Sequence, residues 1–339
     1  MGAFIPECLS ESPFTQRLLD AGLTRIHRGK VRDTYELPGH PEHLLQVATD
    51  RLSIFDFVLP GEVPDKGAVL TALTVYWFHE ILTEQRHHLA AFGAGLDAFL
   101  PENLRGFGAL RARAVIIRKL DMVPVECVVR GYLTGSGWSS YRKTRSISGH
   151  ILPEGLHDGS KLPEALFTPT TKAETGHDEA IGADEVRKEH GSWLEALSLS
   201  VYRRLHDHAA TRGIILADTK FEFGQGGILG DEVGTPDSSR FWDRQEWERA
   251  AEQRRSPSGY DKQPVREWGK TVVTPFVKDG KPVTGIDGLD PEDAEQRRFV
   301  HGLTVPEAVL DSTTERYRSI FKRLTGLDLA DFQTRSLGL

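Results

Sequence analysis

The segment from Ile214 to Phe223 constrains the fold more than any other part of this sequence, because Ile-Ile-Leu-Ala is followed by Asp-Thr-Lys-Phe-Glu-Phe. Side chains of a β-strand alternate between the two faces of a sheet, so one face receives Asp218, Lys220 and Glu222. A strand at a solvated sheet edge is one interpretation of this charged face. The fully apolar start is typical instead of a central, buried strand. The segment therefore predicts an interior strand with one wholly charged face.

A hairpin is predicted directly after this strand. Gly224 to Gly230 is a turn followed by a short apolar run, and two carboxylates, Asp231 and Glu232, come next. Carboxylates on adjacent strands repel each other unless a cation lies between them. Mg²⁺ takes oxygen ligands from one or two carboxylates and completes its shell with water and phosphate oxygens. The hairpin is therefore a candidate magnesium site.

Two long helices are predicted from apolar residues that recur with helical spacing. One stripe runs from Trp193 to Leu205 and ends before Gly213, so this helix packs against the sheet. The other stripe, residues 317–324, predicts a C-terminal helix that begins with a capping box at Ser312 and ends at Gly326.

Three other segments have simpler patterns. Thr134 to Gly159 is polar with Gly and Ser, which predicts a loop, and Trp242 to Arg255 predicts a strongly charged helix. Residues 256–301 are rich in Pro, Gly and Asp without clear periodicity, and we interpret them as an extension over the surface. Pattern alone indicates a fold that mixes helices and strands.

A basic turn is the first candidate for binding an anion. Gly29 stands between Arg28, Lys30 and Arg32. Glycine lets backbone amides approach a phosphate, and Lys supplies a compact charge. An ordinary basic surface turn is the alternative. The sequence contains neither a P-loop nor a Rossmann glycine pattern, so the common nucleotide folds lack their main signal.

Two further runs combine arginine with small or hydroxyl residues. In Val125 to Ser136, strand alternation places Glu126 and Arg130 on one face before a turn containing Ser136. Arg130 and Ser136 suit a phosphate, although a structural ion pair between Arg130 and Glu126 is equally compatible with the pattern. Thr235 to Arg240 offers hydroxyls and a guanidinium to the same kind of ligand, with a helix-capping turn as the alternative.

Composition excludes several classes of protein. The formal charge of −7 argues against a broad nucleic-acid or anionic-lipid surface. The apolar runs are all shorter than the roughly 18 to 20 residues that span a bilayer. With only two cysteines, no metal-ligand spacing and no membrane segment, we expect a cytoplasmic protein that binds neither nucleic acid nor membranes.

Taken in order, six runs resemble the SAICAR synthetase (phosphoribosylaminoimidazole-succinocarboxamide synthase) family of purine biosynthesis. The runs are Gly29–Asp33, Asp50–Asp56, Val125–Ser136, Thr168–Glu174, Ala217–Gly224 and Asp231–Arg240. The family ligates L-aspartate to the carboxylate of carboxyaminoimidazole ribotide with ATP and Mg²⁺. The resemblance implies an α+β fold in two lobes, with an antiparallel sheet-rich N-terminal lobe (residues 1–120), a larger α/β C-terminal lobe (residues 121–339) and ATP in the cleft. It also implies small-molecule substrates, and we expect a monomer because the chain resembles the longer form of the family.

The resemblance also implies roles for individual residues. The ATP phosphates would contact Gly29, Lys30 and Arg32, and the adenine side would be near Glu126. Glu222 and Asp231 would hold Mg²⁺. The ribotide, mainly its phosphate, would be bound by Arg130, Ser136 and Arg240. The loops facing the imidazole ring or aspartate would contribute Ser53, Asp56, Lys66, His177 and Asp178.

The same resemblance places four residues at the reacting groups. Lys220 and Lys172 would stabilise charge near the reacting carboxylate, and Asp218 and Asp237 are candidates for the base that accepts a proton from the amine of aspartate. The alternatives are another carboxylate–amine ligase, a small-molecule kinase, and a nucleotide-binding regulatory protein without turnover.

Overall fold

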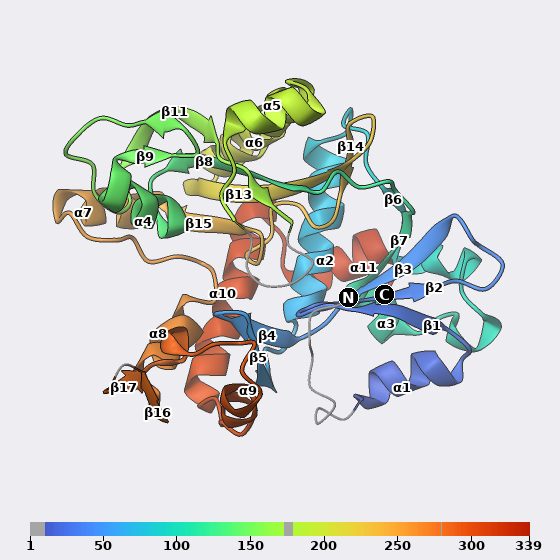
Figure 1. Ribbon diagram of the computed structural model, residues 1–339. Helices are drawn as coiled ribbons and strands as arrows, with labels where there is room; N and C mark the ends of the chain where they lie inside the picture. The colour runs from blue at the N-terminus through green and yellow to red at the C-terminus, as the bar shows by residue number, and fades with distance from the viewer. Residues whose placement is uncertain (1–10, 173–178, 279) are drawn as a thin grey trace.

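The computed structural model describes residues 11–172, 179–278 and 280–339 as an α+β fold built on two antiparallel sheets (Figure 1). The smaller sheet has the strand order β1-β2-β3-β7-β6. Its strands are β1 (Thr24–Arg28), β2 (Arg32–Glu36), β3 (His43–Ala48), β6 (Leu89–Phe92) and β7 (Ala114–Arg118).

The larger sheet is organised around its longest strand, β13. Its order is β11-β8-β13-β14, with β12 also paired to β8 and β15 also paired to β13. The strands are β8 (Val125–Tyr132), β11 (Lys161–Phe167), β12 (Thr170–Thr171), β13 (Ile214–Gly224), β14 (Ile228–Gly230) and β15 (Ser239–Asp243). The predicted interior strand and the hairpin after it are thus confirmed, and the solvated-edge interpretation is wrong.

Short hairpins and helices complete the fold. The hairpins are β4 (Arg51–Ile54) with β5 (Phe57–Glu62), β9 (Ser146–Ile147) with β10 (His150–Ile151), and β16 (Val273–Lys278) with β17 (Lys281–Thr284). The α-helices are α1 (Pro13–Asp20), α2 (Lys66–Tyr76), α3 (Gly108–Arg113), α4 (Gly135–Thr144), α5 (Ala183–His190), α6 (Trp193–Thr211), α7 (Arg244–Glu252), α8 (Gln263–Thr271), α9 (Ala294–His301), α10 (Glu307–Thr325) and α11 (Leu329–Leu337). A π-turn, η1 (Trp77–Ile81), extends α2, and 3-10 turns are η2 (Gly93–Ala98), η3 (Glu102–Leu104) and η4 (Ile286–Gly288).

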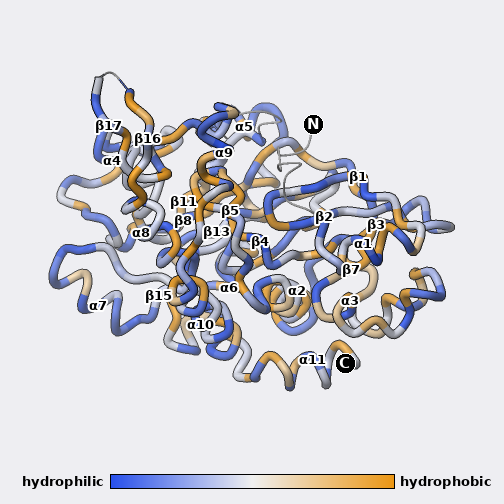
Figure 2. Tube along the Cα trace, turned by 90° about the horizontal axis from the view of Figure 1, so that it is seen from below, coloured by the Kyte–Doolittle hydropathy of each residue, from blue (hydrophilic) through white to orange (hydrophobic). Residues whose placement is uncertain are grey.

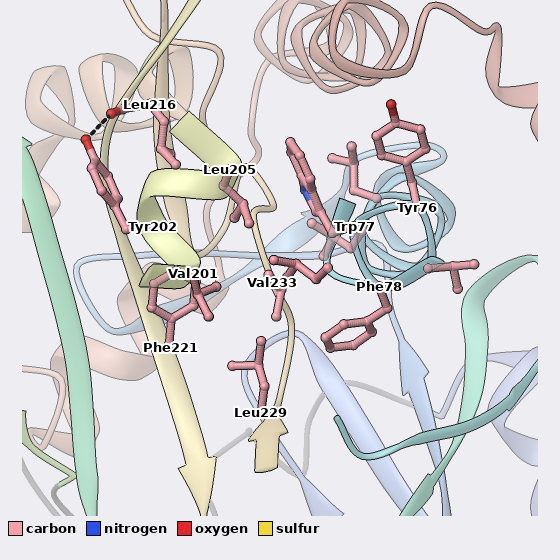
Figure 3. Packing of buried hydrophobic residues seen from close by; sticks show 14 of the residues in the cluster. Tyr76, Trp77, Phe78, Val201, Tyr202, Leu205, Leu216, Phe221, Leu229 and Val233 are labelled. Carbon is pink, nitrogen blue, oxygen red and sulfur yellow. Dashed lines mark hydrogen bonds between the residues drawn. The ribbon is translucent and has the colours of Figure 1, made fainter. Parts of the chain in front are cut away.

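One apolar core joins the two sheets through α2. Every residue of α2 is buried, as expected for a helix that is apolar on all sides. Figure 3 shows Trp77 and Phe78, just after α2, facing Leu205 of α6 and Leu229 of β14. The Trp77 indole N–H donates to the backbone oxygen of Gly234 at 2.9 Å. In Figure 2 the hydrophobic residues of α2 lie inside the molecule, whereas much of the outer chain around α7 is hydrophilic.

Residues 256–301 are more regular than their sequence pattern indicates. They form α8, the β16–β17 hairpin, η4 and α9. Val265, Ile286 and Val300 of this segment share an apolar cluster with Leu52 and Phe57 of the β4–β5 hairpin. Their spacing shows no single period because each short element contributes only one or two residues to the cluster.

Three local predictions are wrong. The segment 134–159 is not a loop, because it contains α4 and the β9–β10 hairpin. Trp242 lies in β15, and the charged helix begins at Arg244, where the Asp243 carboxylate accepts the Glu246 N–H at 2.9 Å. Ser312 lies inside α10, which begins after Pro306.

The part of the chain that the structure describes contains no helix long and apolar enough to cross a membrane.

Candidate active site

The charged face of β13 is matched by charges on its neighbour β8. Asp218 lies opposite Arg130, and their side chains form an ion pair of 2.6 Å. Lys220 reaches Glu126 at 2.7 Å. The alternative pairing of Arg130 with Glu126 is therefore wrong, because each of these residues pairs across to β13 rather than along its own strand.

Glu222 and Asp231 come together at the β13–β14 hairpin. Glu222 lies opposite Gly230, and Asp231 is the next residue, with a left-handed backbone (φ 51°). Burial, with the neighbouring charge of Asp231, raises the pKa of Glu222, whose exposed fraction is 7%. The pKa of Asp231 is lowered because Arg32 and the nearby lysines outweigh the opposing effect of burial. The buried Glu222 and the partly exposed Asp231 thus share one electrostatic environment.

Cationic side chains reach these carboxylates from two separate parts of the chain. Lys172 forms an ion pair with Glu222, and Arg32 of β2 forms one with Asp231. Arg32 also lies 2.7 Å from Glu232. The smaller sheet therefore contributes a guanidinium to the acidic hairpin of the larger sheet, which places Arg32 and Asp231 in one site.

The donor set at this hairpin fits a hard divalent cation. Glu222 and Asp231 supply only oxygen ligands. Burial, and after it the charge of Asp231, raises the pKa of Glu222, and a divalent ion would favour its ionised form. Among the described residues no three His, Cys, Asp or Glu side chains gather into a complete metal cage. The site therefore suits Mg²⁺, which needs only one or two carboxylates beside phosphate and water oxygens.

His88 supports the backbone around Asp231. Its N–H donates to the backbone oxygen of Leu229 at 3.0 Å, and its own backbone oxygen accepts from Arg118 N at 2.8 Å. Residue 88 thus links β14 to β7. Burial lowers the pKa of His88 to about 4, so the ring is neutral near pH 7 beside the Asp231 backbone.

The predicted basic turn joins β1 to β2. The Gly29 N–H donates to the backbone oxygen of Arg32 at 2.7 Å, which closes the turn. The Lys30 side chain lies 2.5 Å from Asp56 at the tip of the β4–β5 hairpin. Because Arg32 points into the acidic hairpin, the interpretation of this segment as merely a basic surface turn is wrong.

The β1–β2 turn is too tight to accommodate a side chain at position 29. We therefore expect Gly29→Ala to weaken anion binding there. A Cβ at position 29 would lie 2.8 Å from the Arg32 backbone oxygen, and the turn would have to open. We expect a loss of nucleotide affinity of about tenfold, comparable to losing one or two hydrogen bonds to a charged group. Gly95→Ala is the control, since its nearest atom would be 3.7 Å away. Calorimetric titration with ADP measures both; equal affinities in the two variants would contradict the prediction.

A second cationic site lies at the start of α4. Arg130 donates to Ser136 Oγ at 2.9 Å and to Thr168 Oγ1 at 3.0 Å, while Arg240 lies 2.5 Å from Asp218. The Arg240 guanidinium packs against Gly135, where a Cβ would meet it at 2.5 Å. Two arginines, a hydroxyl and the N-terminus of a ten-residue helix therefore converge. This arrangement suits a phosphate.

A third group of charges is buried between α2, α8 and α10. Asp237 lies 2.6 Å from Lys66 Nζ and 3.7 Å from Lys262 Nζ, and the Tyr317 hydroxyl donates to it at 2.6 Å. These cations and the hydroxyl outweigh burial and hold the pKa of Asp237 well below its usual range. The capping-turn interpretation of residues 235–240 is wrong, because this segment leads into β15 and Asp243 caps the helix.

The remaining predicted residues are placed as follows. Ser53 is buried on β4, opposite Val58 of β5. His177 and Asp178 lie outside the described residues. Residues that the sequence did not single out are Lys262, Tyr317, Thr168 and His88. Of these four, only Thr168 could have been identified from the sequence, because it begins one of the six runs that resemble the family.

Comparisons with known proteins agree with this geometry. Residues 25–283 match the SAICAR synthetase family. Phosphoribosylaminoimidazole-succinocarboxamide synthase of Saccharopolyspora erythraea is 43% identical over 321 residues, which cover 92% of this chain and 97% of that protein. The SAICAR synthase of Saccharomyces cerevisiae, solved in complex with SAICAR, is 34% identical with a TM-score of 0.74, covering 91% of this chain and 97% of that chain. A Type-2 SAICAR synthetase solved in complex with ADP shares the fold, at 24% identity and a TM-score of 0.55 over 90% of this chain and 98% of that chain.

Proposed function

The chain belongs to the SAICAR synthetase family, and from that premise we propose how its residues carry out the family's reaction. The protein is a carbon–nitrogen ligase of purine biosynthesis. It joins the amine of L-aspartate to the carboxylate of carboxyaminoimidazole ribotide and converts ATP to ADP and phosphate.

A carboxylate is a poor electrophile, so the ribotide carboxylate must be activated before an amine can attack it. Transfer of the γ-phosphoryl group to it gives an acyl phosphate, whose phosphate is a good leaving group. Phosphoryl transfer requires mainly positioning and cationic stabilisation. The lysines and arginines around β13 supply both.

We place the ATP phosphates between the β1–β2 turn and the β13–β14 hairpin, with residues 1–120 and 121–339 as the two lobes around them. The observation that supports this placement is the reach of Arg32 from the turn to Asp231 and Glu232. Gly29, Lys30 and Arg32 would bind phosphate oxygens, Glu126 would lie on the adenine side, and Glu222 and Asp231 would hold Mg²⁺. When bound there, Mg²⁺ would neutralise part of the negative charge on the phosphates.

We place the ribotide phosphate at the start of α4, against Arg130, Ser136 and Arg240. From there the ribotide would extend along the charged face of β13. Lys220 and Lys172 flank Glu222 and would stabilise negative charge on the carboxylate being activated. The pKa of Lys220 is raised because Glu126 outweighs burial, so its ammonium stays protonated.

For the base, the geometry favours Asp218 over Asp237. Both guanidiniums near Asp218 bond to its Oδ2, and within the described residues no hydrogen bond is made to Oδ1. Asp237 is occupied by Lys66, Lys262 and Tyr317, and its lowered pKa makes it a weak base. We therefore assign proton acceptance from the amine to Asp218 and an electrostatic anchoring role to Asp237.

Ser53, Asp56 and Lys66 belong in this proposal to the side that holds the imidazole ring and aspartate. Asp56 acts there through Lys30, and the fully buried Lys66 acts through Asp237. We also propose a monomer, because residues 256–301 cover the apolar side of the β4–β5 hairpin.

The function is tested by measuring ADP and phosphate release with each substrate omitted in turn. We expect stoichiometric ADP and SAICAR only when ribotide, L-aspartate, ATP and Mg²⁺ are all present. A stable phosphorylated product without aspartate would indicate a kinase. ATP binding without hydrolysis in the complete mixture would indicate a regulatory protein.

A further inference from the structure

The Arg51 guanidinium donates hydrogen bonds to the β1–β2 turn and to Asp33 of β2 through all three of its nitrogens. It forms two hydrogen bonds with the Asp33 carboxylate, at 2.5 and 3.1 Å. The same group donates to the backbone oxygens of Gly29 at 2.9 Å and Lys30 at 3.3 Å. Asp33 is 1% exposed, and its carboxylate also lies 3.8 Å from the Arg25 guanidinium.

Thr49 bonds to the next carbonyl of the turn, that of Val31. Its backbone N–H and its Oγ1 both donate to the backbone oxygen of Val31, at 2.9 and 2.8 Å. Three successive carbonyls, those of Gly29, Lys30 and Val31, are therefore bonded to residues 49–51, which connect β3 to β4.

This arrangement determines where the turn's N–H groups point. In a planar trans peptide the C=O and the following N–H point in opposite directions. The N–H groups of Lys30, Val31 and Arg32 are consequently directed away from Arg51 and Thr49. In the described part of the chain, no acceptor takes the N–H groups of Lys30 and Val31. Successive free amides of this kind make a concave anion site.

We propose that Arg51 is a positioning residue that pre-organises the amides of residues 30–32 for the nucleotide phosphates. The inference rests on the proposed function, since it assumes that this turn binds ATP. Arg51 itself faces the rear of the turn and does not contact the nucleotide. Lysine cannot replace it, because one ammonium cannot bond to a carboxylate and two carbonyls in a fixed planar fork.

The test compares Arg51→Lys with Arg113→Lys. Arg113 is a neighbouring, partly buried arginine that pairs with Asp50 at 2.8 Å and does not contact the turn. We expect Arg51→Lys to raise the KM for ATP about tenfold, as for one or two lost bonds to a charged ligand. The KM values for ribotide and aspartate should stay within about twofold, and Arg113→Lys should leave all three near those of the wild type. The Kd for ADP should rise in parallel with the KM for ATP, and the Kd for adenosine should not.

Thr49→Val provides a second test if Arg51→Lys folds poorly. It removes the Oγ1 hydrogen bond to Val31 but keeps the shape and the backbone N–H, so it should raise the KM for ATP in the same selective way by a smaller factor. If all three KM values rise together, or none does, the inference is wrong while the ligase assignment stands. If the wild-type enzyme does not need ATP, the proposed function itself is wrong.

Discussion

Replacing Glu222 by Gln is expected to lower turnover by about 10²–10³-fold, the range seen when one preorganised electrostatic contact at a transition state is lost. A neutral amide cannot balance the charge of a divalent cation shared with Asp231. The affinity for Mg²⁺ in the presence of ADP should therefore fall together with kcat. Steady-state kinetics and a titration with Mn²⁺ followed by electron paramagnetic resonance measure the two effects separately.

The same variant should not be less stable than the wild type. Burial raises the pKa of Glu222, so its ionised form is unfavourable in the folded protein, and a neutral Gln relieves this cost. Lys172 is partly exposed and can turn toward solvent. Glu246→Gln, which breaks an ion pair with Arg255 far from the hairpin, is the control. Near-normal turnover and metal affinity in Glu222→Gln would remove the basis for the metal site.

Replacing Asp237 by Asn is expected to lower the free energy of unfolding by about 3–5 kcal/mol, the usual cost of removing one partner from a buried ion pair. Lys66 and Lys262 would then lie in the interior without this counter-charge, and the Tyr317 hydroxyl would donate to a neutral amide oxygen instead of a carboxylate. Urea unfolding at pH 7 measures the change. The double variant Lys66→Met/Asp237→Asn removes one of the orphaned charges and should recover part of the loss.

The contribution of Asp237 should also depend on pH with a defined sign. Its pKa in the folded protein lies below that of the unfolded chain, so the stabilisation is present above about pH 4 and is lost as the pH falls further. The difference in unfolding free energy between wild type and Asp237→Asn should shrink in that acid range. A loss below 1 kcal/mol at pH 7 would contradict a buried charge cluster.

The site could be predicted from sequence where its residues follow one another along a strand. The period of two placed Asp218, Lys220 and Glu222 on one face of β13, and the turn after it brought Asp231 alongside. Partners across strands could not be predicted, because register depends on the whole sheet. This is why the ion pair of Arg130 with Asp218 was not foreseen.

Site residues contributed by remote helices were still harder to predict from the sequence. Tyr317 lies in the apolar stripe of α10, and nothing in that stripe distinguishes a hydroxyl bonded to Asp237 from an ordinary core aromatic. Lys262 comes from residues 256–301, whose sequence shows no clear periodicity. The helix α4 was missed because its Gly and Ser residues have low helix propensity and are typical of loops.

We propose that the carboxylates of Glu222 and Asp231 converge on a divalent ion that binds the terminal phosphates of ATP. A crystal structure with Mg²⁺ and a non-hydrolysable ATP analogue tests it directly. We predict one metal ion bonded to an oxygen of each carboxylate and to the phosphates, with Lys172 moved away from Glu222. A metal and triphosphate bound elsewhere, with Lys172 and Arg32 still paired to these two carboxylates, would contradict a metal site at the β13–β14 hairpin.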